Sequence, residues 1–124
     1  MILGVGIDII EVDRVAEKVA KDNGFREKVF SAEEIRFCTS GNRAAEAFAV
    51  RFAAKEAFLK ATGRGLTAGH ELCDIEVVSD SLGKPDIRLH NSFAQMAEHS
   101  GWRKIHLSLS HIKAAACAVV ILES

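Results

Sequence analysis

Residues 48–60 read Phe48-Ala-Val-Arg-Phe-Ala-Ala-Lys-Glu-Ala-Phe-Leu-Lys60 and lie within a helical pattern that spans residues 44–62. Apolar side chains fall at nearly every angle around this helix, which is typical of a helix buried on most of its sides. Gly63 and Gly65 follow directly, and glycine is the residue that most often closes a helix in a left-handed cap. The stretch therefore predicts a long central helix on which the rest of the chain packs.

Four charged residues interrupt the apolar stretch 48–60: Arg51, Lys55, Glu56 and Lys60. Removing an ion from water is costly, so each of them needs a partner or a ligand. Glu56 and Lys60 are four residues apart, a spacing that also suits an ordinary intrahelical ion pair. Arg51 and Lys55 have the same simple explanation if neighbouring elements supply their partners. The helix alone leaves the structural and the ligand-binding explanations open.

An apolar, β-branched stretch at residues 2–12 predicts a strand that carries a carboxylate, Asp8, in its middle. Gly4 and Gly6 in this strand indicate a close backbone approach or a bulge. Taken alone, Asp8 is best explained as a solvent-facing or capping residue. Taken with Glu56, it gives two hard oxygen ligands that can hold Mg2+ and leave positions for water and substrate phosphates.

An amphipathic helix follows this strand, with Asp13 as its predicted N-cap. Its apolar side carries Val15, Ala16 and Val19. The opposite side forms a basic stripe of Arg14, Lys18 and Lys21.

Further helices and strands complete an α+β pattern. Ser31 and Glu34 form a capping box that starts a short helix ending near residues 40–42, and Asn91 is the predicted cap of a helix at 91–100. Strands are predicted at residues 74–79, 86–90, 104–110 and 114–122, with turns at 81–84 and near His111 and Lys113. We therefore expect the long helix to pack on a small antiparallel sheet.

Composition limits the class of protein. With 124 residues, of which 48% are hydrophobic, a single domain over residues 1–124 can bury a core without disulfides or metal. The net charge of −1 and the lack of long like-charged runs argue against a nucleic-acid partner. Three well-separated cysteines suggest buried thiols in a reducing cytoplasm. The N-terminal segment has no basic leader or cleavage site, so we expect a cytoplasmic protein without a membrane partner.

Two short patterns are weak by themselves. Gly63-Arg-Gly65 could present backbone N–H groups and a guanidinium to a phosphate, although most such turns are only helix caps. Gly4-x-Gly6 is not a dinucleotide fingerprint, and no Walker loop is present. His111 follows a strand, where it can contact a ligand or simply be solvated.

Together, Gly4-Val-Gly-Ile-Asp8, Arg51-Phe-Ala-Ala-Lys-Glu-Ala-Phe-Leu-Lys60 and Gly63-x-Gly65 resemble the short phosphopantetheinyl transferases, the holo-acyl-carrier-protein synthases. The likeness extends over essentially the whole chain. It includes Glu11-x-x-Arg14, Phe30-Ser31 followed by Glu34, Gly83-Lys84-Pro85, and His106-Leu-Ser-Leu-Ser-His111. The resemblance implies the α+β fold of that family and a homotrimer whose active sites lie between neighbouring subunits.

The resemblance also implies roles for individual residues. Asp8 and Glu56 match the Mg2+ ligands, for which Mn2+ is also suited, and Lys60 matches a lysine on the pyrophosphate of coenzyme A; these three would be the catalytic residues. The positions that contact or frame the nucleotide are matched by Arg51, Lys55, Gly63, Gly65 and His111. Arg14 matches a docking position for the acidic acyl carrier protein, and Lys18 and Lys21 extend that surface.

The implied reaction is the Mg2+-dependent transfer of 4'-phosphopantetheine from coenzyme A to a serine of apo acyl carrier protein. It releases 3',5'-ADP and belongs to fatty acid biosynthesis. Some relatives have Asp two residues after the position of Glu34, where this chain has Arg36. The proton acceptor is therefore open between Glu34, a metal-bound water and Glu56 acting indirectly. Ser110 stands where some relatives have Thr.

Two other functions compete with transfer. The first is a module that binds coenzyme A or a carrier without reacting, with Arg36 marking a lost base. The second is a Mg2+-dependent hydrolase that uses Asp8 and Glu56 to cleave a nucleotide pyrophosphate with water. Neither accounts for the joint presence of the basic stripe and the two main motifs.

Overall fold

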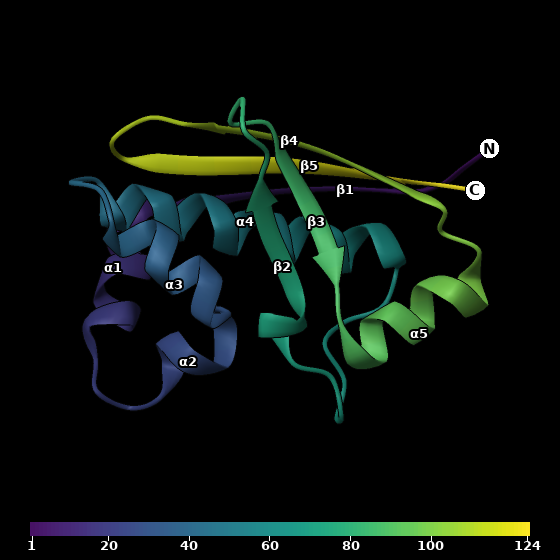
Figure 1. The fold of residues 1–124 in the computed structure, drawn as a ribbon, viewed down its shortest axis with the longest axis horizontal. Coiled ribbons are helices and arrows are strands. Elements are labelled where there is room, and N and C mark those ends of the chain that lie inside the picture. The colour runs from purple at the N-terminus through teal and green to yellow at the C-terminus, as the bar shows by residue number, and fades with distance from the viewer.

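The long central helix, α4 (Ala44–Thr62), packs against a three-stranded antiparallel sheet. The strand order in this sheet is β1 (Ile2–Glu11), β5 (Ala115–Glu123) and β4 (Lys104–His111). In the computed structural model, which describes residues 1–124, α4 runs along one face of the sheet (Figure 1). The predicted α+β arrangement, with a long helix on a small antiparallel sheet, is confirmed.

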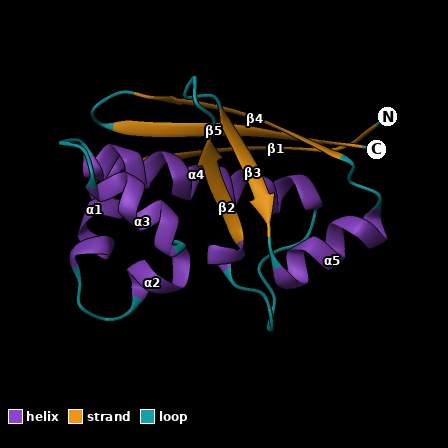
Figure 2. Ribbon diagram, in the orientation of Figure 1, coloured by secondary structure: helices purple, strands orange, loops and turns teal.

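A second sheet and several shorter helices surround α4 (Figure 2). The second sheet is a hairpin of β2 (Ile75–Ser79) and β3 (Pro85–Leu89), entered through a 3-10 turn, η1 (Leu72–Asp74). The other helices are α1 (Val12–Ala20), α2 (Phe25–Val29), α3 (Ala32–Thr39) and α5 (Asn91–Ser100). Figure 1 shows α1, α2 and α3 near the start of α4 and α5 near its end.

Two glycines let α4 approach β1 at backbone contact. A Cβ at Gly4 would lie 2.0 Å from the carbonyl oxygen of Ala61, and one at Gly6 would lie 1.9 Å from that of Ala57. Both distances are far below van der Waals contact, so no larger residue fits without moving the helix. The predicted close approach is confirmed, and a bulge also interrupts the strand between Ile2 and Gly4. Side chains alternate along a strand, so Asp8 lies on this same helix-facing side.

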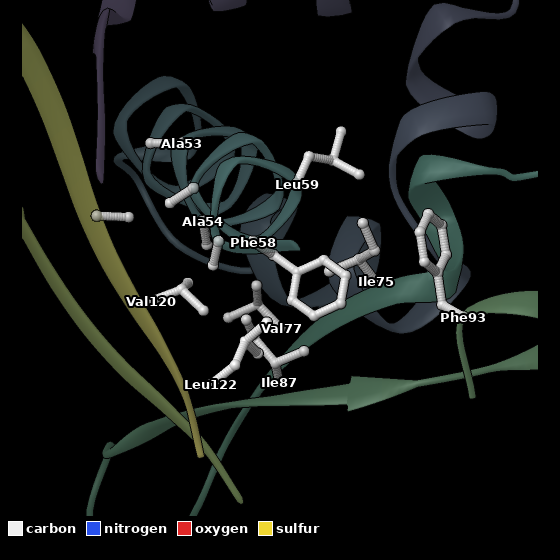
Figure 3. Close-up of a cluster of buried hydrophobic side chains, with 13 residues drawn as sticks. Ala53, Ala54, Phe58, Leu59, Ile75, Val77, Ile87, Phe93, Val120 and Leu122 are labelled. Atoms are coloured by element: carbon white, nitrogen blue, oxygen red, sulfur yellow. The ribbon is translucent and has the colours of Figure 1, made fainter. Parts of the chain in front are cut away.

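The main core lies between α4, the three-stranded sheet and the hairpin (Figure 3). Phe58 of α4 is fully buried at its centre. Its ring makes edge-on contacts with Phe93 of α5 and with Trp102, both at 5.8 Å between centroids. These contacts hold the C-terminal half of α4 against α5 and the loop before β4.

The other face of the three-stranded sheet is apolar and uncovered. Val5, Ile7 and Ile9 of β1 are 58%, 66% and 73% exposed. Their partners across the strand pair are Ile121, Val119 and Cys117 of β5, so one apolar strip spans both strands. Such a contiguous exposed strip is typical of a protein–protein contact.

Helix starts differ from the sequence-based predictions. Strand β1 runs directly into α1, which begins at Val12, and Asp13 lies in the first turn instead of capping the helix. The N–H of Val12 donates to Ala114 across the sheet, which makes a side-chain cap unnecessary. Asn91 has φ 54° and donates to Asp74, and it is also not a cap. Helix α2 was not predicted, since five residues carry no clear periodicity.

The three cysteines are free, as predicted, but only Cys38 is fully buried, and burial raises its pKa to about 11. Cys73 and Cys117 are partly exposed, so the expectation of three buried thiols was wrong for these two. None of the helices combines the length and hydrophobicity needed to span a lipid bilayer.

Candidate active site

The fold brings Asp8, Glu56 and Lys60 to one place. The Nζ of Lys60 donates to Asp8 Oδ1 at 3.1 Å and to the carbonyl oxygen of Ile7 at 3.1 Å. Glu56 lies one helical turn before Lys60 and therefore on the same side of α4. Lys60 pairs with Asp8 across the two elements, so the intrahelical pair with Glu56 is not formed. The ammonium group of Lys60 thus pairs with Asp8 alone, and Glu56 forms no ion pair within the chain.

The surroundings of Glu56 raise its pKa above the ordinary 4.5. Burial is the main cause and the Asp8 carboxylate the second, while Lys60 and Lys18 act in the opposite direction. Two close carboxylates with too little positive charge suit a hard divalent cation. No third Asp, Glu, His or Cys joins them, so a bound ion would keep positions for water or phosphate oxygens.

An open groove of about 420 Å³ begins beside Glu56 and Lys60. Its other lining residues are Leu59, Gly63, Arg64, Gly65 and Leu66. Gly63 closes α4 with φ 71°, and its N–H donates to the carbonyl oxygen of Lys60 at 3.1 Å. Because the helix cap uses the N–H of Gly63, this group is not available to a ligand. The N–H of Gly65 has no partner in the chain and remains available to a ligand.

Lys55 is fully buried, and its ammonium group is saturated. It donates to Glu34 Oε1 at 2.8 Å, to the carbonyl oxygen of Leu72 at 3.2 Å, and to that of Ile75. An ammonium group has three hydrogens, so none is left for a nucleotide. Burial lowers the pKa of Lys55 despite this pairing. The simple explanation, a partner on adjacent elements, holds for Lys55, and within this chain its ammonium group is not directed to the groove.

Glu34 is equally occupied. Its Oε1 accepts the N–H of Ser31 at 2.9 Å as well as Lys55, and its Oε2 accepts the N–H of Val77 at 3.0 Å. The capping box predicted from Ser31 and Glu34 is present, and the same carboxylate also anchors β2. Glu34 is 1% exposed, so it cannot accept a proton from a substrate in solution. One of the three candidate bases is thereby removed.

Arg51 points away from the groove. Five residues separate it from Glu56, a rotation of about 140° around the helix. Its guanidinium stacks on Phe37 of α3, 4.2 Å from the ring centroid, and donates to the carbonyl oxygen of Ala47 at 3.2 Å. Arg51 is 5% exposed, and its Nε has no partner. The structure does not bring Arg51 together with the Asp8 cluster.

His111 lies at the other end of α4. It is the last residue of β4, not a turn residue, and its Nδ1 is 3.3 Å from Glu46 Oε2 in the first helical turn. At 1.5 Å per residue, the fourteen residues from Glu46 to Lys60 span about 21 Å. A separate hollow of about 590 Å³ lies here, lined in part by His111, Arg43 and Lys113. Within one chain, His111 and the groove are therefore apart.

The basic stripe of α1 extends toward Glu56. Arg14, Lys18 and Lys21 are exposed, as predicted. The Nζ of Lys18 lies 5.8 Å from the ring centroid of Phe25 and 6.0 Å from that of Phe52. Phe52 is one turn before Glu56, which explains why Lys18 lowers the pKa of that carboxyl. This electrostatic link was missed, because it depends on how α1 packs on α4 and leaves no pattern in the sequence.

Comparison with known proteins identifies the family. The model of the 4'-phosphopantetheinyl transferase superfamily matches residues 4–120. The chain belongs to this superfamily. Curated holo-[acyl-carrier-protein] synthases of Treponema denticola and Koribacter versatilis are 50% and 45% identical to it over 124 residues, with 99% of both chains covered in each comparison. The chain is therefore an enzyme of this transferase type.

Solved structures agree with this membership. Holo-[acyl-carrier-protein] synthase of Neisseria meningitidis matches with a TM-score of 0.91 and 30% identity, with 100% of both chains covered. The Bacillus anthracis enzyme in complex with CoA (3',5'-ADP) matches with a TM-score of 0.82 and 38% identity, covering 100% of this chain and 98% of that one. The resemblance found in the sequence motifs is confirmed at the level of family and fold.

Proposed function

We propose that the protein transfers the 4'-phosphopantetheine group of coenzyme A to a serine of apo acyl carrier protein, with Mg2+ bound, and releases 3',5'-ADP. The carrier serves fatty acid biosynthesis. The cluster of Asp8, Glu56 and Lys60 beside an open groove is the observation that supports this most directly. The chain belongs to the transferase family, and related enzymes have been solved in complex with coenzyme A. Both observations support coenzyme A as the substrate.

In this reaction the carrier serine oxygen forms a bond to the phosphorus that bears the pantetheine arm, and the bond from that phosphorus to 3',5'-ADP breaks. Lys60 is 57% exposed at its side chain, so its ammonium can stabilise the charge that develops on the leaving phosphate. The free N–H of Gly65 donates to a phosphate oxygen. Mg2+, or Mn2+ in its place, would be held by Asp8 and Glu56 and would neutralise pyrophosphate charge.

Because Glu34 is buried, we infer that the group that accepts the serine proton lies on the side of the groove that Glu56 lines. Glu56 is only half buried, so water reaches its carboxylate. Its raised pKa favours holding a proton more than an ordinary carboxyl does. Glu56 acting through a water molecule is therefore the assignment that this geometry supports best.

A homotrimer completes the site in this proposal. His111 lies about 21 Å from Lys60 along α4, so it reaches the same nucleotide only from a neighbouring copy. The uncovered apolar strip of Val5, Ile7 and Ile9 lies on the strand that carries Asp8. Burying this strip between copies provides the stabilisation for assembly. The solution mass, measured by sedimentation equilibrium, is expected to be three times 13.5 kDa.

The direct test is the intact mass of an apo acyl carrier protein after incubation with the enzyme, coenzyme A and Mg2+. We expect a gain of one phosphopantetheine on the wild-type carrier and none on a carrier whose acceptor serine is alanine. No gain, with coenzyme A binding intact, would favour a non-catalytic binding module. Release of free phosphopantetheine without carrier would instead indicate a hydrolase.

Reversing the charge of Arg14 is expected to weaken carrier binding. Arg14→Glu should raise the KM for the acyl carrier protein about tenfold, because an attractive contact becomes a repulsive one in the encounter with an acidic partner. The kcat should change little, since Arg14 does not touch Asp8, Glu56 or Lys60. Arg103→Glu makes the same charge change directly before β4 and serves as the control. Equal KM values for the two variants would remove the docking role of α1.

A further inference from the structure

A third and larger hollow, of about 830 Å³, lies between β3, α5 and the first half of β4. It shares no residue with the groove beside Glu56 and Lys60. Its floor consists of apolar side chains that the core leaves partly exposed. They are Leu89, Ala97, Trp102, Ile105 and Leu107. Apolar surface at the bottom of a concave site favours an occupant that can remove it from water.

Four cationic side chains stand around this floor. They are Lys84, Arg88, Arg103 and Lys104, and all four are exposed. None of them takes part in any of the seven ion pairs of the structure. His106, also at the rim, is held by Glu123 at 2.8 Å. The rim therefore offers unpaired positive charge to a ligand.

The two carboxylates at the rim are already engaged in local structure. Asp80 Oδ1 accepts the N–H groups of Leu82 at 2.9 Å and Lys84 at 2.8 Å, which shapes the hairpin turn. Asp86 Oδ1 accepts the N–H of Ile87 at 2.9 Å. Four cations against two such carboxylates leave the rim positive overall.

We propose that this hollow binds a single-chain amphiphile with an anionic head, taken up as a monomer. The alkyl chain lies on the floor formed by Trp102, Ile105 and Leu107, where each methylene removed from water adds to the affinity. The carboxylate or phosphate head pairs with Arg88, Arg103 or Lys104 at the rim. The cationic rim thus matches the anionic head of such a ligand, and the apolar floor matches its alkyl chain.

An extended peptide fits the same hollow less well. Strands β3 and β4 each have one edge that is not paired within its sheet, and both edges border the hollow. The two strands belong to different sheets, are not hydrogen-bonded to each other and run in different directions (Figure 1). A single added strand can therefore not pair with both edges, which β-strand addition would need for full affinity.

Trp102 makes the proposal directly measurable, because it is the only tryptophan of the chain. Titration of the full-length protein with dodecanoate, below its micelle concentration, should change tryptophan emission saturably. Acetate, which has the head without the chain, and dodecyltrimethylammonium, which has the chain with a cationic head, should not. A response to the cationic amphiphile equal to that with dodecanoate would overturn the proposal, as would the absence of any saturable response.

Variants separate this hollow from non-specific binding. The double variant Arg88→Glu with Arg103→Glu is expected to weaken dodecanoate binding at least tenfold, whereas Lys28→Glu, an exposed reversal on α2, should leave it unchanged. Circular dichroism verifies that both variants are folded. Equal affinity in the two would exclude the rim from binding. A response to phosphatidylglycerol vesicles but not to dodecanoate would show contact with a membrane surface and refute a monomeric ligand. Neither result depends on the transferase reaction.

Discussion

Replacing Lys55 with methionine is expected to lower the free energy of unfolding by about 3–5 kcal/mol. Methionine fills a similar volume but cannot pair with Glu34, whose carboxylate stays buried among Ser31, Val77 and apolar neighbours. An uncompensated charge in the interior is the main cost, and the carbonyl groups of Leu72 and Ile75 also lose their donor. Urea unfolding followed by circular dichroism measures the change.

A second substitution distinguishes this cause from lost packing. Removing the partner charge as well, in the double variant Lys55→Met with Glu34→Leu, should recover part of the loss, because no unpaired ion then remains in the interior. The recovery is partial, since the N–H groups of Ser31 and Val77 lose their acceptor. Lys28→Met, an exposed change of the same chemistry, should alter stability by no more than about 0.5 kcal/mol. A stable Lys55→Met protein with a raised KM for coenzyme A would contradict the structural role and restore Lys55 as a nucleotide contact.

Lys55 also shows where inference from sequence stops. The apolar pattern of α4 requires every charge on it to have a partner or a ligand. Lys55 and Lys60 have partners within the chain, whereas Glu56 forms no ion pair. Helical periodicity further separates the direction of Arg51 from that of Glu56 by about 140°. Periodicity does not reveal which element packs on each side of the helix. Only the packing of α3 and η1 shows that Arg51 and Lys55 face the interior while Glu56 and Lys60 face a groove.

The capping errors have a similar origin. Asp13 and Asn91 are residue types that favour N-caps, and both precede amphipathic stretches. At Val12 the sheet itself supplies the helix start, through the bond to Ala114. At residue 91 the side chain is drawn to Asp74 on η1. Both outcomes depend on contacts distant in sequence, whereas the capping box of Ser31 and Glu34 is local and was predicted correctly.

Glu56→Gln is expected to lower the rate of transfer by at least about 100-fold, the scale on which a lost electrostatic contact to the transition state acts. Glutamine has nearly the same size and shape as glutamate but carries no charge. It therefore weakens the hold on Mg2+ and cannot accept a proton, while the packing of α4 on β1 is kept. The intact-mass assay with coenzyme A and an apo carrier measures the rate, and Glu98→Gln, at an exposed residue of α5, makes the same chemical change away from the groove.

The same variant should not lose stability, and this separates a functional from a structural role. Burial and the Asp8 carboxylate raise the pKa of Glu56 above 4.5, so its ionised form is disfavoured in the folded protein. Stability linked to this group is fully present below 4.5, the ordinary pKa, and is lost as the pH rises through the raised folded value. At pH 7.5 without Mg2+, Glu56→Gln should therefore be at least as stable as the wild type in urea unfolding.

The wild type should also gain stability relative to the variant as the pH is lowered toward 4, because its carboxyl then becomes neutral like the amide. A variant that loses both turnover and stability at pH 7.5 would assign Glu56 to the framework of α4, and unchanged turnover would remove it from the mechanism. We expect Glu56→Gln to be inactive but stable. In that case the charge of Glu56 serves to bind a cation beside a phosphate, and the fold tolerates its partial burial for that function.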